Sequence, residues 1–279
     1  CYGSTWQKTT LAKGSSYSLP GVRDAEGYTL MGWSTKPMQS VSPQYEAEEK
    51  ITVNGNVDLY AVVFNRTTET DLTEDQLPQV DIYKYKQVIF VGDSRTEFME
   101  NVLTGMGESA TKNVKFVCSA GKGLDWFTTT GWAQLYSIVQ HDSNSILSKK
   151  TAVIFNFGVN DLSKSADYAE YYNWIAPQLK SKGCELYFMS VNPVNRLMLP
   201  NAGRADRSEA AVRSFNQYMK ANLSSAYTYI DMYSYLKSTG YSFASDHYGT
   251  GTVDDGLHYT TRTYKRIFAK CMDSLRVPA

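Results

Sequence analysis

Four short runs of almost continuously apolar residues constrain the fold of this chain more than any other feature. They occupy positions 88–91, 114–117, 152–155 and 186–189. Such runs are typical of strands buried on both faces of a parallel sheet. Between and after them, apolar residues recur at helical spacing over 168–179, 212–223 and 264–272. Because helices with one apolar face cover such sheets, residues 87–279 predict a three-layer α/β/α domain with a mainly parallel sheet.

The first 65 residues follow a different pattern. They are rich in Thr, Tyr, Val and Ser, and Gly or Pro interrupts them about every eight to twelve residues, a rhythm that predicts short strands joined by turns. This segment resembles the internalin-type β-repeat of bacterial surface proteins. The residues that carry the resemblance lie at positions 19–20, 27–30, 32–35 and 57–62. The alternative is a generic small β module built around Trp33. In either case the segment contains no obvious group of catalytic residues.

A polar, acidic stretch separates these two parts. It is rich in Thr, Glu and Asp from position 65 to 80 and contains few apolar residues, so we expect residues 66–86 to be a linker. The predicted domains are therefore 1–65 and 87–279. We expect the first to be separable, because about 190 residues are enough for the second to bury its own core.

Charge and cysteine content exclude several functions. Lys plus Arg equals Asp plus Glu at 28 each, so the chain lacks the net charge on which nucleic-acid or anionic-membrane binding relies. We expect neither partner, no transmembrane segment and no intact signal peptide in the sequence. The four cysteines lack the paired spacings of zinc sites, so no metal is expected. Cys118 and Cys184 lie in apolar runs and predict buried side chains, whereas Cys1 is either a lipidated N-terminus or, as we favour, an arbitrary start.

Polar residues follow three of the apolar runs at the points where the strands should end. Ser94 lies in a Gly-Asp-Ser triplet, Gly121 and Gly123 follow the second run, and Asn160 follows the third. Ligands of open α/β sheets bind outside the carboxyl ends of the strands, so these residues are candidates for one site. Each has an alternative interpretation, namely a helix cap for the serine triplet, a plain turn for the glycines and an Asx turn for the asparagine.

The most informative motif is Asp255-Gly256-Leu257-His258, which precedes the last predicted helix. A carboxylate three residues before a histidine can hold the imidazole in one tautomer and stabilise its charged form. Taken alone, His258 can equally be a surface histidine beside a helix cap. Together with the motifs above, it completes a serine, histidine and aspartate set.

These motifs, in this order, resemble the SGNH hydrolases, also called GDSL-like esterases, over residues 87–275. The resemblance implies a flavodoxin-like α/β fold, ester hydrolysis without a cofactor, and a triad in which Ser94 is the nucleophile, His258 the base and Asp255 its orienting carboxylate. It also implies an oxyanion hole made by the Ser94 amide, the Asn160 side chain and a glycine amide. That glycine is assigned to Gly121, with Gly123 as the alternative.

One departure from the family and several aromatic residues bear on the substrate. Arg95 stands where many members carry an aliphatic residue. It can meet a polar group of the substrate or pair with a nearby acid. Aromatic side chains near the motifs can form a floor on which a sugar stacks, and these are Trp126, Phe127, Tyr168 and Tyr259.

We therefore expect an esterase acting on O-acetyl groups, on small molecules or on polysaccharides such as a cell-wall or surface glycan. The alternatives are an O-acyltransferase that uses the same triad, and an adhesion protein whose hydrolase-like domain is inactive. The β-repeat resemblance further predicts a bacterial protein that is secreted or held at the cell surface.

Overall fold

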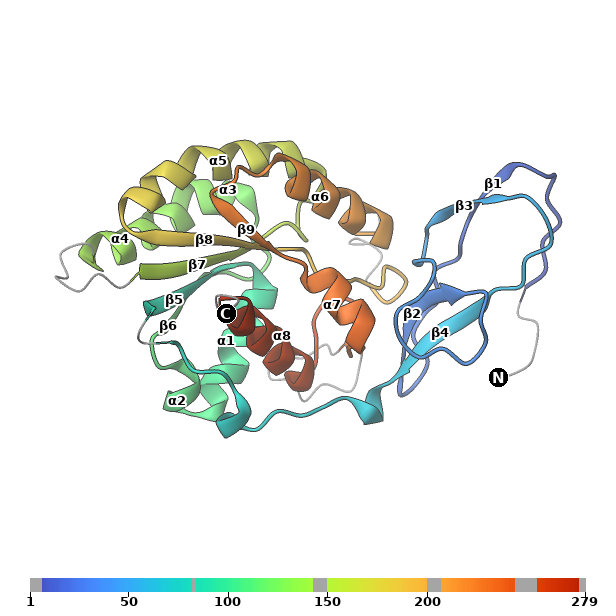
Figure 1. Ribbon diagram of the computed structural model, residues 1–279, viewed down its shortest axis with the longest axis horizontal. Helices are drawn as coiled ribbons and strands as arrows, with labels where there is room; N and C mark the ends of the chain where they lie inside the picture. Colours follow the sequence, from blue (N-terminus) through green and yellow to red (C-terminus); the bar gives the residue numbers. More distant parts are fainter. Residues whose placement is uncertain (1–6, 82–83, 143–149, 200–206, 244–254, 276–279) are drawn as a thin grey trace.

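The computed structural model describes residues 7–81, 84–142, 150–199, 207–243 and 255–275 (Figure 1). Cys1 and Asp254 lie outside these ranges. A larger α/β domain and a smaller β domain lie side by side, with the C-terminal helix against the sheet of the larger one. The order of the elements along the chain agrees with the predicted sequence of a β segment followed by an α/β domain.

The larger domain is built on a parallel sheet of five described strands in the order β6-β5-β7-β8-β9. The four apolar runs form the first four strands along the chain, as predicted. The fifth strand was not predicted, because its Tyr-Thr-Tyr-Ile sequence is short and partly polar. The strands are β5 (Tyr85–Gly92), β6 (Val114–Cys118), β7 (Lys150–Asn156), β8 (Cys184–Met189) and β9 (Tyr227–Ile230).

Helices cover both faces of this sheet, which confirms the three-layer fold (Figure 1). Alternate residues of one strand enter opposite cores: Phe90 of β5 packs with α1 and α8, whereas Val91 packs on the side of α4, α5 and α6. The helices are α1 (Ser94–Met106), α2 (Glu108–Thr111), α3 (Leu124–Trp126), α4 (Trp132–Asp142), α5 (Ser165–Ser181), α6 (Glu209–Asn222), α7 (Met232–Thr239) and α8 (Thr261–Ser274).

The predicted helical segments correspond to α5, α6 and α8. Tyr168 and Tyr172 of α5 are fully buried, so the tyrosine stripe of this helix packs on the sheet, as its spacing indicated. The π turn Phe127–Gly131 and the 3₁₀ turn Leu162–Lys164 lead into α4 and α5.

The smaller domain contains two antiparallel strand pairs, β1 (Ser15–Ser18) with β3 (Lys50–Val53) and β2 (Tyr28–Ser34) with β4 (Tyr60–Asn65). Trp33 is buried, and its indole N–H donates to the carbonyl of Pro20 at 2.9 Å. This ring thus anchors a small core, because a buried indole needs a partner for its single donor.

The segment between the domains, predicted as a linker because it has few apolar residues, packs on the larger domain. It forms the 3₁₀ turns Arg66–Thr68 and Glu74–Gln76 and then buries Leu77 and Val80 in the core beside α1 and α8. The buried carboxylate of Glu69 pairs with Arg266 of α8 at 3.1 Å. Few but well-placed apolar residues and one buried ion pair are therefore enough to fix this stretch.

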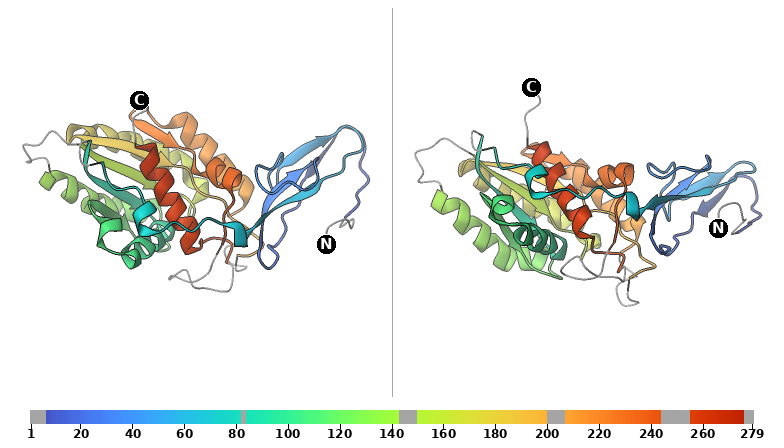
Figure 2. Two further views of the ribbon diagram at one scale, coloured as in Figure 1. Left: turned by 60° about the horizontal axis from the view of Figure 1, so that its bottom comes forward. Right: turned by 90° about the horizontal axis from the view of Figure 1, so that it is seen from below.

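The two domains also touch directly. Figure 2 shows the small domain against the end of the larger one that carries α7. The ring of Phe64 lies so close to Gly240 that a Cβ there would come within 2.2 Å of it. The ammonium of Lys237, 5% exposed, donates to the carbonyl of Met31 at 2.8 Å. Met31 and Phe64 consequently belong to the same apolar cluster as the helices α1 and α8.

Candidate active site

Ser94 lies where the first strand of the sheet meets its helix. Strand β5 ends at Gly92, and Ser94 is the first residue of α1. Asp93 caps this helix, since its carboxylate accepts a hydrogen bond from the Arg95 amide at 3.0 Å. Burial raises the pKa of Asp93 to about 6, against the opposing charge of Arg95. The capping role that the triplet predicted therefore belongs to Asp93, and the Ser94 hydroxyl has another partner.

Sheet topology places this serine where the strand order reverses. From β5 the chain crosses to the edge strand β6 and then returns to β7 on the other side of β5. Ligands of such sheets bind between the carboxyl ends of the two strands where the order reverses. Ser94 follows β5 and Asn160 follows β7, whose ends are paired through Gly92 and Asn156.

The structure brings Ser94, His258 and Asp255 into one hydrogen-bonded chain. The distance from Ser94 Oγ to His258 Nε2 is 2.9 Å, and that from His258 Nδ1 to Asp255 Oδ2 is 2.5 Å. With the proton of the imidazole on Nδ1, where the carboxylate accepts it, Nε2 is free to accept the serine proton. This arrangement can activate a serine for attack on a carbonyl carbon.

The carboxylate of Asp255 is held as an anion. Its Oδ1 accepts hydrogen bonds from the amides of Leu257 and His258, both at 2.8 Å. Burial acts to raise the pKa of Asp255, but the hydrogen bond and charge of His258, with these two amides, lower it below its usual value. The Asp255 side chain therefore stays charged and fixed in direction.

A phenylalanine fixes the plane of the histidine. The ring centroids of Phe98 and His258 are 4.2 Å apart, and Phe98 is itself buried in the core beside α1. Since the aromatic ring covers one side of the imidazole, rotation of the histidine away from the serine is restricted.

The side chain of Asn160 is held at both ends. Its Nδ2 donates to the carbonyl of Lys122 at 2.8 Å, which uses one of its two N–H bonds. Its Oδ1 accepts a hydrogen bond from Arg207 Nη2 at 2.8 Å, and Nε of the same arginine donates to the carbonyl of Val159 at 2.9 Å. The arginine fork therefore sets the orientation of the carboxamide.

Two glycines of the 121–123 turn lie beside this asparagine, and they differ in their surroundings. A Cβ on Gly121 would meet nothing within 4 Å, whereas one on Gly123 would come within 2.3 Å of Asp161 Oδ2. The same Asp161 carboxylate accepts the Leu124 amide at 2.9 Å. Position 123 is thus packed tightly against the residue that follows Asn160, while position 121 is exposed.

The residues of this candidate site fall within one family match. The family model described as GDSL-like lipase/acylhydrolase matches residues 88–271. The chain belongs to the GDSL-like lipase/acylhydrolase family. A second model, described as the Listeria-Bacteroides repeat domain, matches residues 2–62, which confirms the predicted bacterial β-repeat at the N-terminus.

Several solved structures align with much of this chain at low sequence identity. A putative acylhydrolase from Bacteroides fragilis has 16% identity and a TM-score of 0.45, with 72% of this chain and 92% of that chain covered. A putative SGNH hydrolase from Slackia heliotrinireducens has 13% identity and a TM-score of 0.48, covering 69% and 100%. An acetyl xylan esterase has 11% identity and a TM-score of 0.45, covering 68% and 100%. None of the curated proteins matches the chain significantly.

Arg95, where this family member departs from the common pattern, does not face a substrate. Its side chain is 3% exposed, and its guanidinium donates to the carbonyls of Leu257, Asn192 and Pro193, each at 2.9 Å. The expected role in substrate binding is therefore wrong. The arginine instead ties helix α1, which begins with Ser94, to the loop that carries His258 and to the segment after β8.

The predicted aromatic floor is also wrong for three of its four rings. Phe127, Tyr168 and Tyr259 are fully buried, because their rings complete the packing between helices and sheet. The hydroxyl of Tyr259 donates to the carbonyl of Pro193 at 2.5 Å. Only Trp126 is partly exposed, with its ring beside Phe157.

Other sequence predictions have mixed outcomes. Cys184 is buried as predicted, whereas Cys118 is only partly buried. Within the described ranges, no three His, Cys, Asp or Glu side chains gather as a metal site requires, and no helix is long and apolar enough to cross a membrane. The orienting role of Arg207 was missed, since nothing in the sequence connects it with Asn160 more than forty residues away.

Proposed function

We propose that this chain is a serine esterase in which Ser94 is the nucleophile, His258 the general base and acid, and Asp255 the orienting carboxylate. The observation that carries this proposal is the 2.9 Å distance between Ser94 Oγ and His258 Nε2, with Asp255 on the opposite nitrogen of the ring. Membership in a family of acylhydrolases supports the same reaction class.

Acylation follows from this geometry. The Ser94 hydroxyl gives its proton to Nε2 of His258 while Oγ attacks the ester carbonyl carbon. The charged imidazole is stabilised by the Asp255 anion. When the tetrahedral intermediate collapses, Nε2 returns the proton to the alcohol oxygen, the carbon–oxygen bond breaks, and the acyl group remains on Ser94.

Deacylation repeats these steps with water. A water molecule gives a proton to Nε2 and its oxygen attacks the acyl carbon. Collapse then releases the carboxylic acid and returns the proton to Ser94 Oγ. No electron acceptor, metal or organic cofactor enters either half of this cycle.

We propose that the oxyanion is bound by the Ser94 amide, the Asn160 side chain and an amide of the 121–123 turn. The Ser94 amide is at a helix N-terminus, where backbone N–H groups lack helical acceptors. The choice between the two glycine amides rests on packing. Contact with Asp161 supports Gly123 over Gly121, because a donor must be fixed before the charge develops.

We propose O-acetyl esters of carbohydrates as the substrates and a secreted or surface-held location. The β-repeat supports a polymeric surface substrate, such as a cell-wall glycan, by acting as a tether that raises local concentration. Among the four aromatic residues predicted near the motifs, Trp126 alone is partly exposed, and we assign it the stacking on a sugar.

Turnover of p-nitrophenyl acetate tests the reaction class. We expect hydrolysis by the natural protein, none above background by Ser94→Ala, and full activity in Ser119→Ala, a matched serine at the end of the neighbouring strand. Equal rates for Ser94→Ala and the natural protein would end the triad assignment. Absence of turnover in all three, with retained glycan binding, would favour an adhesion protein instead.

A second experiment tests the substrate class. We expect acetate release from acetylated polysaccharide, and we expect Trp126→Ala to raise KM for that polymer while KM for p-nitrophenyl acetate stays constant. Faster cleavage of long acyl chains than of acetate would contradict the proposal. Transfer of the acetyl group to an added sugar in place of water would identify an O-acyltransferase.

A further inference from the structure

The segment 190–199, between β8 and α6, connects three parts of the molecule. Arg95 of the nucleophile's helix donates to its carbonyls at Asn192 and Pro193. Three residues beyond Asn192, Asn195 bonds both to the loop that carries Asp255 and to the β-repeat. The β-repeat therefore contacts a segment that also holds the triad.

On the side of the repeat, the carboxamide of Asn195 meets acceptors that are fixed in place. Its Nδ2 donates to the carbonyl of Val22 at 3.0 Å and to Asp24 Oδ1 at 2.8 Å. The Asp24 side chain is fully buried and pairs with Arg66 at 2.8 Å. Because a buried carboxylate with several donors has little freedom, Asp24 anchors Asn195 firmly.

On the side of the triad, the backbone of Asn195 holds the turn between Asp255 and His258. Its amide donates to the carbonyl of Gly256 at 2.8 Å. Gly256 has a φ of +70°, and a Cβ there would lie 2.3 Å from the carbonyl oxygen of Asn195. The two segments are thus in close contact at the residue next to the catalytic carboxylate, where only glycine fits.

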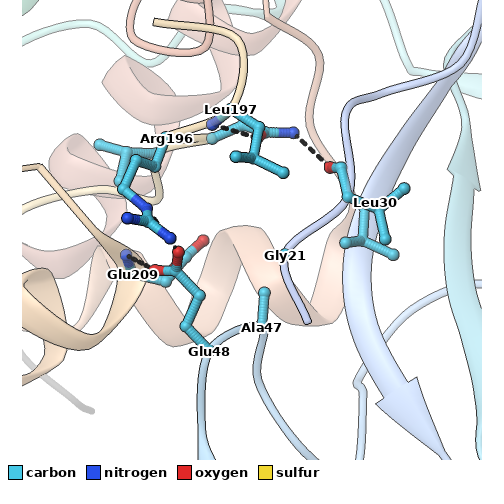
Figure 3. A pocket seen from close by; sticks show the side chains of 10 residues that line it. Gly21, Leu30, Ala47, Glu48, Arg196, Leu197 and Glu209 are labelled. Atoms are coloured by element: carbon cyan, nitrogen blue, oxygen red, sulfur yellow. Dashed lines mark hydrogen bonds and ion pairs between the residues drawn. The ribbon is translucent and has the colours of Figure 1, made fainter. Parts of the chain in front are cut away.

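Further contacts surround this connection. Arg196 pairs with Glu48 of the repeat at 2.7 Å, and Lys237 lies between Glu46 and Glu209 at 3.0 and 3.1 Å. Figure 3 shows Arg196 reaching towards Glu48 at the edge of a small pocket between the domains. The pocket has a volume of about 20 Å³, room for one water molecule, so this is a packed interface and not a substrate site.

We propose that the β-repeat is a positioning element of the active site and that Asn195 is the positioning residue through which it acts. By anchoring Asn195, the repeat fixes the turn at Gly256 and thereby the direction in which Asp255 meets His258. This inference rests on the proposed function, because it assigns a second support to the same acid–base pair. It gives the repeat a part in the chemical step, beyond any role as a tether.

The test uses the full-length chain and one isosteric substitution. Asn195→Asp keeps the backbone bond to Gly256 but sets a carboxylate against the Asp24 carboxylate, so the two segments repel. The matched control is Arg196→Ala, which breaks an ion pair in the same interface without a side-chain link to the triad turn. For p-nitrophenyl acetate we expect kcat to fall about tenfold or more in Asn195→Asp with KM nearly constant, and little change in Arg196→Ala.

A second readout needs no turnover. The proton NMR signal of the His258 Nδ1–H reports its hydrogen bond to Asp255, and we expect it to shift or broaden in Asn195→Asp but not in Arg196→Ala. An unmoved signal together with an equal loss of kcat in both variants would overturn the inference, because the interface would then only stabilise the fold. Should Asn195→Asp fail to fold, Asn195→Ala removes the bonds to Val22 and Asp24 without repulsion, along with the bond that Asn195 Oδ1 accepts from the Leu197 amide at 3.2 Å, and it carries the same expectations.

These measurements separate the inference from the proposed function. Loss of turnover in Ser94→Ala, together with unaltered kcat and NMR signal in the Asn195 variants, would keep the esterase and reject the positioning role. An inactive natural protein whose His258 signal still moves in Asn195→Asp would reject the esterase and keep the structural connection.

Discussion

The two sides of Ser94 are supported in different ways. On one side, the loop with Asp255 and His258 is held by Arg95 and by Asn195, which is in turn bonded to the β-repeat. On the other side, Asn160 is held by Lys122 and Arg207. The contacts of this second set are all internal to the hydrolase domain.

This difference teaches that the residues proposed for proton transfer and those proposed for oxyanion binding have separate structural supports. A disturbance of the repeat should reach His258 and Asp255 through the segment 190–199, whereas Asn160 should be little affected. Substitutions on the two sides should therefore have distinguishable consequences, which the following predictions exploit.

The largest effect is expected on the triad side. Asp255→Asn should lower kcat for a small ester by roughly a thousandfold or more, because an amide no longer selects the tautomer or stabilises the charged imidazole. The measurement is steady-state kinetics, and Asp254→Asn is the control, since it changes the neighbouring carboxylate in the sequence. The reverse ranking of the two variants would show that Asp254 is the orienting acid.

On the oxyanion side, Asn160→Ala should lower kcat roughly a hundredfold with a modest change in KM, the signature of a donor used mainly in the transition state. Single-turnover measurements of acyl-enzyme formation would assign this loss to the acylation step. A change in KM alone would instead make Asn160 a binding residue and would remove one side of the comparison.

Removal of the β-repeat tests directly whether the loop with Asp255 and His258 depends on it. A protein that starts near residue 80 loses the acceptors of Asn195 as well as the buried pair of Glu69 with Arg266. Contrary to the separability that the sequence alone predicts, we expect it to be insoluble or at least about tenfold less active on p-nitrophenyl acetate. A soluble truncated protein with full activity would show that the triad turn needs no support from the repeat.

The smallest effect is expected for the arginine behind Asn160. Arg207→Lys cannot reach both Asn160 Oδ1 and the carbonyl of Val159, because an ammonium lacks the planar fork of a guanidinium. We expect a loss of only a few-fold in kcat, with KM constant. Arg262→Lys on α8, whose side chain is 45% exposed and pairs with Asp71, is the matched control, and an equal loss in both variants would assign the effect to general destabilisation.

Much of the fold could be predicted because its signals are local. Four of the five described strands of the sheet are nearly continuous apolar runs, and α5, α6 and α8 carry apolar residues at helical spacing. Strand β9 and helix α7 are short and rich in tyrosine, so their sequences do not distinguish a buried element from a loop.

In the site, too, residues with local sequence signals could be predicted, whereas contacts between distant segments could not. Asp255 and His258 are three residues apart, and Ser94 follows a clear strand, so their meeting could be anticipated. The environment of Arg95 could not be predicted from the sequence, because the three carbonyls that accept its hydrogen bonds belong to segments about one hundred or more residues away. The docking of the repeat on Asn195 depends in the same way on contacts between distant segments.

The most direct test of the account is covalent labelling with a fluorophosphonate, which reacts with activated serines. Peptide mapping of the labelled full-length protein should find the adduct on Ser94 alone, and Ser94→Ala should take up no label. His258→Gln should slow labelling strongly while Ser94 remains the site of any residual reaction. Labelling at another serine, or equal labelling of Ser94→Ala, would contradict the claim that Ser94 is the nucleophile.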